Sequence, residues 1–222
     1  MADSTTTATS TTPTPKTYIV EHLDPELGPW SELEYLCVAR ETQAATRGDS
    51  RFVLSSLPPA LRVPPAIGAV PAFAAERRGV EDMYPGEEAR ARVCLLDPQA
   101  ERDLAPEDVG VFDVFLFGGI LGDDPPRDRT SELRKKGYAG RRLGPVQMTT
   151  DTAVRVTRMV IEEQYTLTTV PYLDFPELKF NEHESTQMPF RYVKGSDRKP
   201  IMPEGMVDLI KKDADKSIDD LF

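Results

Sequence analysis

A glycine-rich segment that follows an apolar run is the first place where this sequence could carry chemistry. Residues 111–117 are apolar except for Asp113, and they lead directly into Gly118-Gly119-Ile120-Leu121-Gly122. Ligands of open parallel sheets bind beyond the carboxyl ends of the strands, and glycines there allow a ligand to approach the backbone closely. The segment matches neither nucleotide fingerprint, G-x-G-x-x-G after a strand or G-x-x-x-x-G-K-[ST]. A tight turn without a ligand explains the glycine spacing equally well.

Charged residues come next along the chain. Asp123, Asp124 and Asp128 lie with two arginines between positions 123 and 129, and two prolines stiffen the segment. A carboxylate here could act as a general base or a substrate clamp, and a group of carboxylates could bind Mg²⁺. The plainer interpretation is a solvated loop in which Asp128 caps a helix, and we favour it for Asp124 and Asp128. For Asp123, which adjoins the glycine turn, we favour a functional role.

A second loop, residues 141–151, leads into a predicted helix. Backbone N–H groups at a helix start lack partners within the helix, so such a loop can hold a ligand. The alternative is structural, with Thr149 as an N-cap and Met148 as a core residue. Two further carboxylates, Glu21 and Asp97, end predicted strands and could face the same crevice.

Strands alternate with helices along the chain, which predicts an α/β fold with a mainly parallel sheet flanked by helices. The run at 111–117 predicts a strand buried on both faces. Residues 1–16 are nearly all Ser, Thr, Ala and Pro and predict a disordered tail, which leaves one domain over 17–222. The Pro/Ala-rich stretch 58–92 predicts only short, interrupted helices. The other strands are predicted at 18–20, 51–54, 93–96 and 141–143, and the helices from Pro29, from Asp128 to Gly137, from Thr149 to about Tyr165, and briefly after Pro203.

Composition excludes several functional classes. Of 222 residues, 27 are Lys or Arg and 37 are Asp or Glu, so the net charge is −10 and a basic partner suits the chain better than a phosphate backbone. No apolar run approaches the roughly 18 residues of a membrane span. Two histidines cannot build a multi-histidine metal centre, and no metal ligands are predicted. Cys37 and Cys94 lie far apart in the sequence, each in an apolar stretch, which predicts two buried free thiols rather than a disulfide. Free thiols are typical of a reducing compartment, so we expect a cytoplasmic protein.

Seven segments, taken in order, are characteristic of one family: YIVEHLDPELGPWSELEY at 18–35, FVLSSLP at 52–58, VCLLDP at 93–98, FGGILGDDPPRDRTSEL at 117–133, RRLGPVQMTTDTAVR at 141–155, MPFRYV at 188–193 and MPEGMVDLIKKD at 202–213. The chain resembles the eukaryotic and archaeal SPOUT-type protein arginine methyltransferases. The resemblance runs from about Tyr18 to the C-terminus and is most specific over 117–155. The stretch 59–92 departs from the family pattern.

This resemblance implies a SPOUT fold whose C-terminal part forms a deep trefoil knot, an arrangement that ordinary folds avoid. It also implies that the knot loops bind S-adenosylmethionine. The corresponding residues in this sequence are Leu95, Leu96 and Asp97 at a strand end, Phe117, Gly118, Gly119, Ile120, Leu121 and Gly122 in the first loop, and Leu143, Gly144, Gln147, Met148 and Thr149 in the second.

The resemblance further implies a monomer that modifies a small-subunit ribosomal protein, without direct contact to nucleic acid or membrane. Arginine is a difficult methyl acceptor because its guanidinium stays protonated. A carboxylate can orient the guanidinium and accept its proton, and Asp123 is the first candidate, with Glu21 and Asp128 in reserve. Two alternatives remain open: an RNA methyltransferase of the same fold, and a ribosome-assembly factor without catalytic activity.

Overall fold

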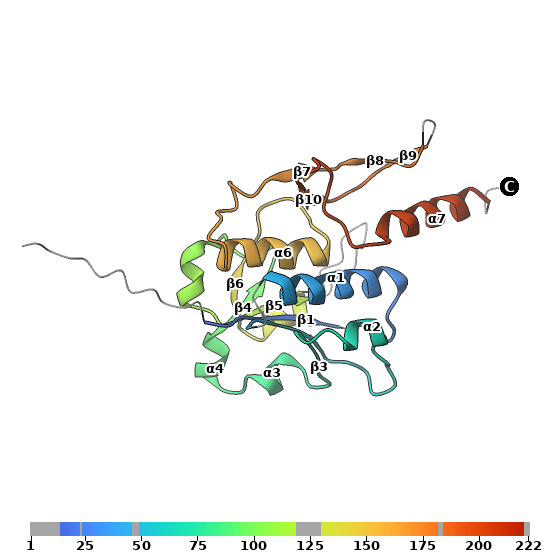
Figure 1. Cartoon of the computed structure of the whole chain (residues 1–222). Helices are drawn as coiled ribbons and strands as arrows, with labels where there is room; N and C mark the ends of the chain where they lie inside the picture. The colour runs from blue at the N-terminus through green and yellow to red at the C-terminus, as the bar shows by residue number, and fades with distance from the viewer. Residues whose placement is uncertain (1–13, 23, 46–48, 119–129, 182–183, 220–222) are drawn as a thin grey trace, which may run out of the picture.

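The centre of the molecule is a six-stranded parallel sheet. The structure is a computed structural model that describes residues 14–22, 24–45, 49–118, 130–181 and 184–219. For residues 214–219 it describes the backbone alone. The strand order is β3-β2-β1-β5-β4-β6 (Figure 1). All neighbouring pairs run parallel, as the sequence predicts. The strands are β1 (Thr17–Glu21), β2 (Arg51–Ser55), β3 (Phe73–Ala75), β4 (Val93–Leu96), β5 (Val114–Gly118) and β6 (Ala139–Arg141).

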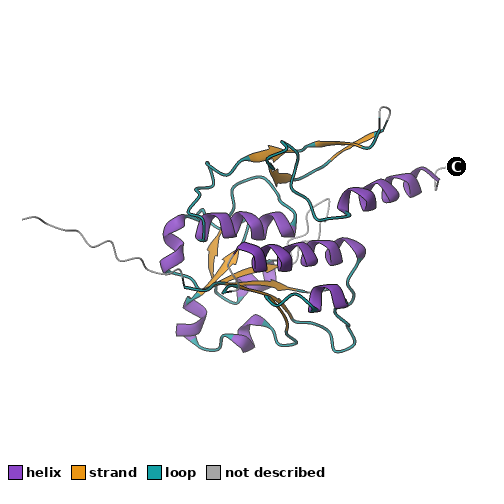
Figure 2. Cartoon of the chain, in the orientation of Figure 1, coloured by secondary structure: helices purple, strands orange, loops and turns teal. Residues whose placement is uncertain are grey.

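Helices cover both faces of this sheet (Figure 2). On one face, the long helices α1 (Pro29–Ala45) and α6 (Thr150–Ile161) and the short α2 (Pro65–Gly68) pack on strand residues such as Phe52 and Phe115. On the other, α3 (Val80–Met83) and α5 (Ser131–Lys135) pack on residues such as Ile19 and Leu116. Apolar side chains on both faces explain why the strands are nearly continuous apolar runs. The remaining helices of this part are α4 (Glu87–Ala91) and the 3-10 helix η1 (Pro106–Gly110).

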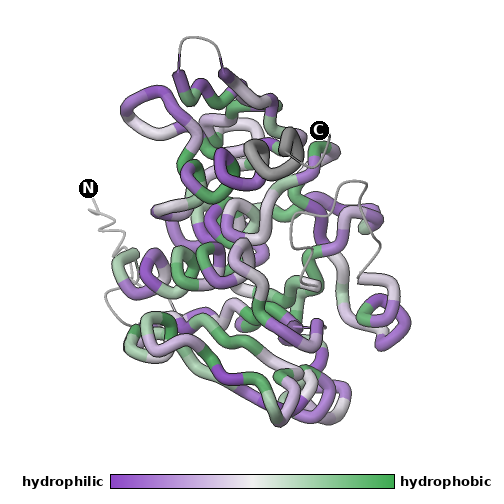
Figure 3. The backbone as a smooth tube through the Cα atoms, turned by 90° about the vertical axis from the view of Figure 1, so that its right-hand side faces the viewer, coloured by the Kyte–Doolittle hydropathy of each residue, from purple (hydrophilic) through white to green (hydrophobic). Residues whose placement is uncertain are grey.

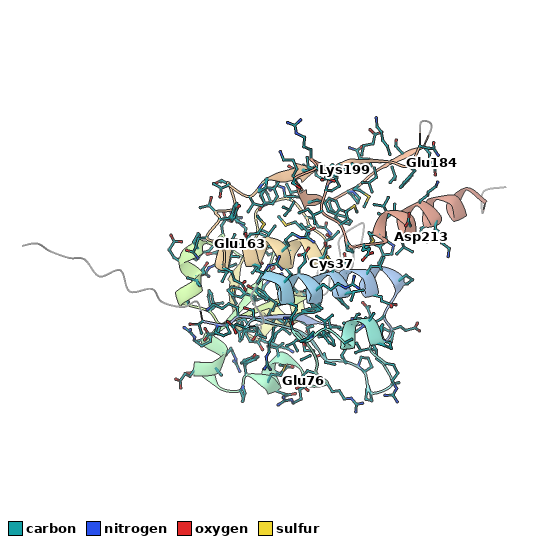
Figure 4. The ribbon with its side chains drawn as sticks, viewed as in Figure 1. Cys37, Glu76, Glu163, Glu184, Lys199 and Asp213 are labelled. Atoms are coloured by element: carbon teal, nitrogen blue, oxygen red, sulfur yellow. The ribbon has the colours of Figure 1, made fainter. Side chains whose placement is uncertain are left out.

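The C-terminal part forms a smaller layer above α1 and α6. Its strands β7 (Tyr172–Asp174) and β10 (Arg191–Val193) pair antiparallel, as do β8 (Glu177–Lys179) and β9 (Ser185–Gln187). Helix α7 (Met206–Asp219) follows, and Trp30 of α1 donates a hydrogen bond from Nε1 to Asp213 Oδ2 at 3.3 Å. Hydrophobic and hydrophilic residues alternate closely along the backbone (Figure 3), whereas the central strands β4 and β5 are buried along their whole length. Glu184 and Asp213 lie on the β8–β9 arm and α7, which project in the same direction (Figure 4).

Several predicted boundaries are wrong for identifiable reasons. Strand β5 begins at Val114 rather than at residue 111, because η1 ends just before it and leaves Val111 exposed. Lys16, assigned to the tail, is buried, and its ammonium donates hydrogen bonds to the carbonyl oxygens of Val109 and Phe112, each at 2.8 Å. Helix α6 ends at Ile161 rather than near residue 165.

Other elements were displaced or missed. The N-cap position of α5 is held by Thr130, not by Asp128. Strand β6 spans residues 139–141 rather than 141–143, and α7 is a helix of 14 residues rather than a short one. The sequence predicts neither β3 nor the four strands β7 to β10, each three residues long. The knot stays a prediction, since the loop 119–129 lies outside the described residues.

Candidate functional site

A pocket of about 420 Å³ opens at the carboxyl ends of β4 and β5. Three segments far apart in the sequence form its walls: the end of β4, the end of β5 with the start of α5, and the loop between β6 and α6. Strand register brings the first two together, because Leu96 lies opposite Phe117. The lining residues are Leu96, Asp97, Pro98, Gln99, Phe117, Gly118, Thr130, Leu143, Gly144, Pro145, Val146, Gln147, Met148 and Thr150.

The loop from Leu143 to Met148 is held in place from the C-terminal layer. Gly144 has a φ of +90°, a conformation that favours glycine and turns the chain around the pocket. Further along, the backbone N–H of Arg191 in β10 donates a hydrogen bond to the Gln147 carbonyl at 2.8 Å. The loop is therefore positioned by a strand that lies more than forty residues away in sequence.

Asp97 ties two walls of the pocket together. Its buried carboxylate accepts hydrogen bonds from Arg134 Nη2 at 2.8 Å, from Thr130 Oγ1 at 3.3 Å and from the Gln99 backbone N–H at 3.0 Å. Burial alone would raise the pKa of Asp97, but the hydrogen bonds and charge of Arg134 outweigh it and hold that pKa below its ordinary value. Asp97 is thus an ionised anchor between β4 and α5, and its oxygens are occupied by protein donors.

Behind the pocket, buried charges link α1 to α6. Arg155 of α6 pairs with Glu41 of α1 at 2.6 Å and with Asp151 at 3.3 Å, and Cys37 lies on α1 beside α6 (Figure 4). Glu34 of α1 is fully buried near Thr150. Burial and the charge of Asp151 raise the pKa of Glu34 well above its ordinary value. A buried carboxyl group that resists ionisation therefore lies close to Thr150 of the pocket wall.

The described structure brings eight of the predicted cofactor residues together in this pocket: Leu96, Asp97, Phe117, Gly118, Leu143, Gly144, Gln147 and Met148. Two others do not line it. Leu95 packs on the opposite face of the sheet, because side chains alternate along a strand. Thr149 holds the N-cap position of α6, and its hydroxyl donates a hydrogen bond to Asp151 at 2.7 Å and lies 2.9 Å from the Thr152 hydroxyl instead. Gly119, Ile120, Leu121 and Gly122 lie outside the described residues.

The residues predicted for the cofactor omit six lining residues. Pro98 and Gln99 directly follow the predicted Asp97, and Pro145, Val146 and Thr150 belong to the loop 141–151 that the sequence predicts as a ligand site. Thr130 carried no such signal. Its role depends on the contact with Asp97, which is 33 residues away in sequence.

Of the three candidate bases, the structure describes only Glu21. It is buried at the carboxyl end of β1, opposite Gly118 of β5, and it does not line the pocket. Its carboxylate accepts a hydrogen bond from Ser56 Oγ at 2.9 Å and lies 3.9 Å from Lys136 Nζ. Asp123 and Asp128 lie outside the described residues, as does the segment considered for Mg²⁺.

The pocket residues suit S-adenosylmethionine. A volume of about 420 Å³ falls in the range of small-molecule sites, which are mainly apolar with a few polar groups. Leucine, phenylalanine, valine and methionine side chains offer an apolar surface for the adenine ring, and a few polar residues, Gln99, Gln147, Thr130 and Thr150, line the same pocket.

Comparisons with known proteins give a consistent result. The family described as "Protein arginine N-methyltransferase SFM1-like" matches residues 17–217. Protein arginine N-methyltransferase SFM1 of Saccharomyces cerevisiae is 45% identical over 216 residues, which cover 92% of this chain and 99% of that protein.

Solved structures agree with this similarity. The crystal structure of the yeast arginine methyltransferase SFM1 complexed with SAM has a TM-score of 0.78 at 42% identity, over 90% of this chain and 91% of that one. The complex of the yeast enzyme with SAH has a TM-score of 0.77 at 41% identity, over 87% and 94%. A full-length spTrm10–SAH complex, 8% identical with a TM-score of 0.51 over 70% and 94%, shares the fold alone.

Proposed function

This chain belongs to the SFM1-like family of S-adenosylmethionine-dependent protein arginine N-methyltransferases, and we propose that its acceptor is an arginine of a basic small-subunit ribosomal protein, which it monomethylates. The pocket at the carboxyl ends of β4 and β5, which gathers eight residues predicted for the cofactor, supports the methyltransferase activity, and the net charge of −10 supports a basic acceptor. The identity with the yeast enzyme extends over nearly the whole of both chains.

The reaction asks three things of the protein. S-adenosylmethionine, when bound, supplies an electrophilic methyl group on a sulfonium. The loop from Leu143 to Met148 and the end of β4, which line the pocket, would hold the cofactor and shield it from water. The acceptor nitrogen must then be held in line with the methyl carbon, and such positioning supplies a large part of the barrier reduction. A carboxylate must orient the guanidinium and accept its proton as the bond forms.

Asp123 is our candidate for that carboxylate, because it follows the glycine segment that continues from Gly118 in the pocket wall. Glu21 is a weaker candidate, since Ser56 and Lys136 already engage its oxygens and its side chain lies off the pocket. Asp128 is the third candidate and lies five residues beyond Asp123.

The net charge supports a protein acceptor. A chain with a charge of −10 attracts a basic protein and repels bare RNA. We propose that the enzyme acts as a monomer in the cytoplasm and contacts neither RNA nor membrane directly. No helix within the described ranges is long and apolar enough to cross a membrane.

Incubation with radiolabelled S-adenosylmethionine and ribosomal extract tests the proposal. We expect the label in a small-subunit protein, with monomethylarginine as the labelled product of acid hydrolysis. The variant Gly144→Val, which distorts the pocket loop, serves as the negative control. Label in ribosomal RNA would instead identify an RNA methyltransferase. Cofactor binding by calorimetry without any transfer would favour an assembly factor.

A further inference from the structure

Phe175, between β7 and β8, combines two unfavourable features. Its φ is +51°, in the left-handed region that bulky residues rarely adopt, and its side chain is 46% exposed. Pro176 follows, and a residue before proline is normally pushed toward an extended conformation. The position is therefore both strained and exposed.

The backbone around Phe175 explains its conformation. Its N–H donates a hydrogen bond to the Phe190 carbonyl at 3.0 Å, and its own carbonyl accepts one from Gln187 Nε2 at 3.3 Å. The next carbonyl, that of Pro176, accepts from the Met188 N–H at 3.0 Å. Here the chain leaves the β7–β10 ladder and enters the β8–β9 ladder. A positive φ serves this change of direction, and glycine would provide it without strain.

The ring itself has no role in the core. Phe175 belongs to none of the hydrophobic clusters formed by the described residues, although Phe180 and Phe190 nearby do. The backbone thus accounts for the positive φ at this position but not for a phenylalanine there. An exposed ring held by a fixed backbone is a preformed contact for another molecule.

The neighbours of Phe175 show how a guanidinium is held on this surface. Asp174 and Glu177 flank the ring with side chains 41% and 54% exposed, and each lies near a cation of this chain, Arg191 for Asp174 and Lys179 for Glu177. Arg191 of β10 lies opposite Asp174, the residue before Phe175. Its guanidinium stacks on Tyr172, with 4.3 Å from the guanidinium carbon to the ring centroid, and pairs with Asp174 at 2.7 Å. This part of the surface therefore already holds one guanidinium between an aromatic ring and a carboxylate, an arrangement well suited to arginine.

The strand that precedes Phe175 is linked to the pocket loop through Arg191. Arg191 pairs with Asp174 through its side chain and with Gln147 of the pocket loop through its backbone. Its guanidinium also lies about 4.0 Å from where a Cβ on Gly144 would be. Phe175, the residue after Asp174, therefore lies at the end of a strand that is connected to the pocket wall.

We propose that Phe175, Asp174 and Glu177 form a docking contact for a basic segment of the protein substrate, with an arginine side chain lying on the exposed ring. The proposal rests on the proposed function and specifies how the substrate is held near the pocket. RNA bases also stack on aromatic rings, but the net charge of −10 on the whole chain favours a basic protein over a phosphate backbone.

Phe175→Gly is the sharpest test, because glycine keeps the turn and removes the ring. We expect KM for the protein substrate to rise about 3- to 30-fold, the range of a cation–π contact, while kcat and the Kd for S-adenosylmethionine stay unchanged. Phe175→Leu, which keeps an apolar side chain, should raise KM similarly, and Phe175→Tyr should restore it. Tyr165→Ala is the matched control, an exposed aromatic beyond the far end of α6 from the pocket.

The outcomes separate this inference from the proposed function. If the wild type methylates the protein substrate and Phe175→Gly does so with the same KM, the docking contact is wrong while the function stands. If Phe175→Leu keeps the wild-type KM, a stacked guanidinium is excluded. If the wild type methylates RNA alone, the proposed function itself fails, and the docking inference fails with it.

Discussion

Replacing Asp97 by alanine should weaken both the fold and the cofactor pocket. The Asp97 side chain is 4% exposed and pairs with Arg134, whose side chain is 34% exposed. Removing one partner of a fully buried pair costs about 3–5 kcal/mol because the other charge is left without a partner. Since Arg134 can regain part of its hydration, we expect about 2–3 kcal/mol. For a protein of this size, that lowers the melting temperature by roughly 4–12 °C.

The same change should reduce affinity for S-adenosylmethionine. Asp97 holds Gln99 of one wall and Thr130 of another, so both lose their common anchor. Thermal denaturation and calorimetric titration measure the two effects. Lys135→Ala is the matched control on the same helix, because its pair with Glu132 is about 70% exposed on both sides and contributes about 0–1 kcal/mol. Melting temperatures of the two variants within 2 °C of each other would refute the reasoning.

The lowered pKa of Asp97 gives this prediction a pH dependence. A carboxylate whose pKa is lower in the folded state stabilises the protein above its unfolded pKa, about 3.9 for aspartate. That contribution disappears as the pH falls through the folded-state pKa. The difference in unfolding free energy between the wild type and Asp97→Asn should therefore be constant near neutral pH and shrink below about pH 4. A difference that grows with acidity would contradict the assigned ion pair.

Four further changes test other parts of the molecule. Gly144→Val forces a branched side chain into a φ of +90° and should cost about 1–2 kcal/mol of stability, together with a lower cofactor affinity in calorimetry. Asp123→Asn should slow methyl transfer by about 10²–10⁴-fold with unchanged cofactor affinity, and normal turnover would move the role of base to another carboxylate. Because the pKa of Glu34 is raised in the folded protein, the wild type should lose stability as the pH rises above about 4, whereas Glu34→Gln should not. The variant should therefore match the wild type near pH 4 and then gain about 1.4 kcal/mol of relative stability per pH unit, until the pH reaches the folded-state pKa of Glu34. Equal denaturation curves of the two proteins at pH 8 would show that this pKa is not raised. Reversing the exposed charges of Glu204 and Asp208 to lysine should raise KM for a basic protein substrate, less so at high salt, and an unchanged KM in both conditions would show that these charges do not attract the substrate.

Local patterns in the sequence were sufficient for the main elements of the fold. The apolar stretches at 18–20, 51–54 and 93–96 are strands in the structure, and the parallel sheet follows from their alternation with helices. The general location of the pocket was also predictable, because the carboxyl ends of parallel strands share one edge of a sheet. Boundaries were less predictable, as at Val111, where an apolar residue is exposed beside η1.

The resemblance of ordered segments to a known family determined more of the function than residue chemistry did. Spacing and composition alone left the glycine segment equally explained by a ligand site or a turn. The segment order from 117 to 155 indicated an arginine methyltransferase that uses S-adenosylmethionine, and the comparisons confirm the family and the cofactor. The ribosomal acceptor and the trefoil knot remain predictions.

Contacts between distant segments were decided only by the tertiary structure. Asp97 meets Arg134 across 37 residues, and Gln147 accepts a hydrogen bond from Arg191 across 44. Such pairs depend on which segments lie side by side in the folded chain. The charges within one segment do not show which distant segment will lie next to it. The strands β7 and β10 are each three residues long. Side chains along a strand alternate between the two faces with a period of two residues, so three residues are too few to show an alternating pattern in the sequence. The sequence by itself therefore determined the elements and the edge at which the pocket lies, whereas packing decided which side chains close it.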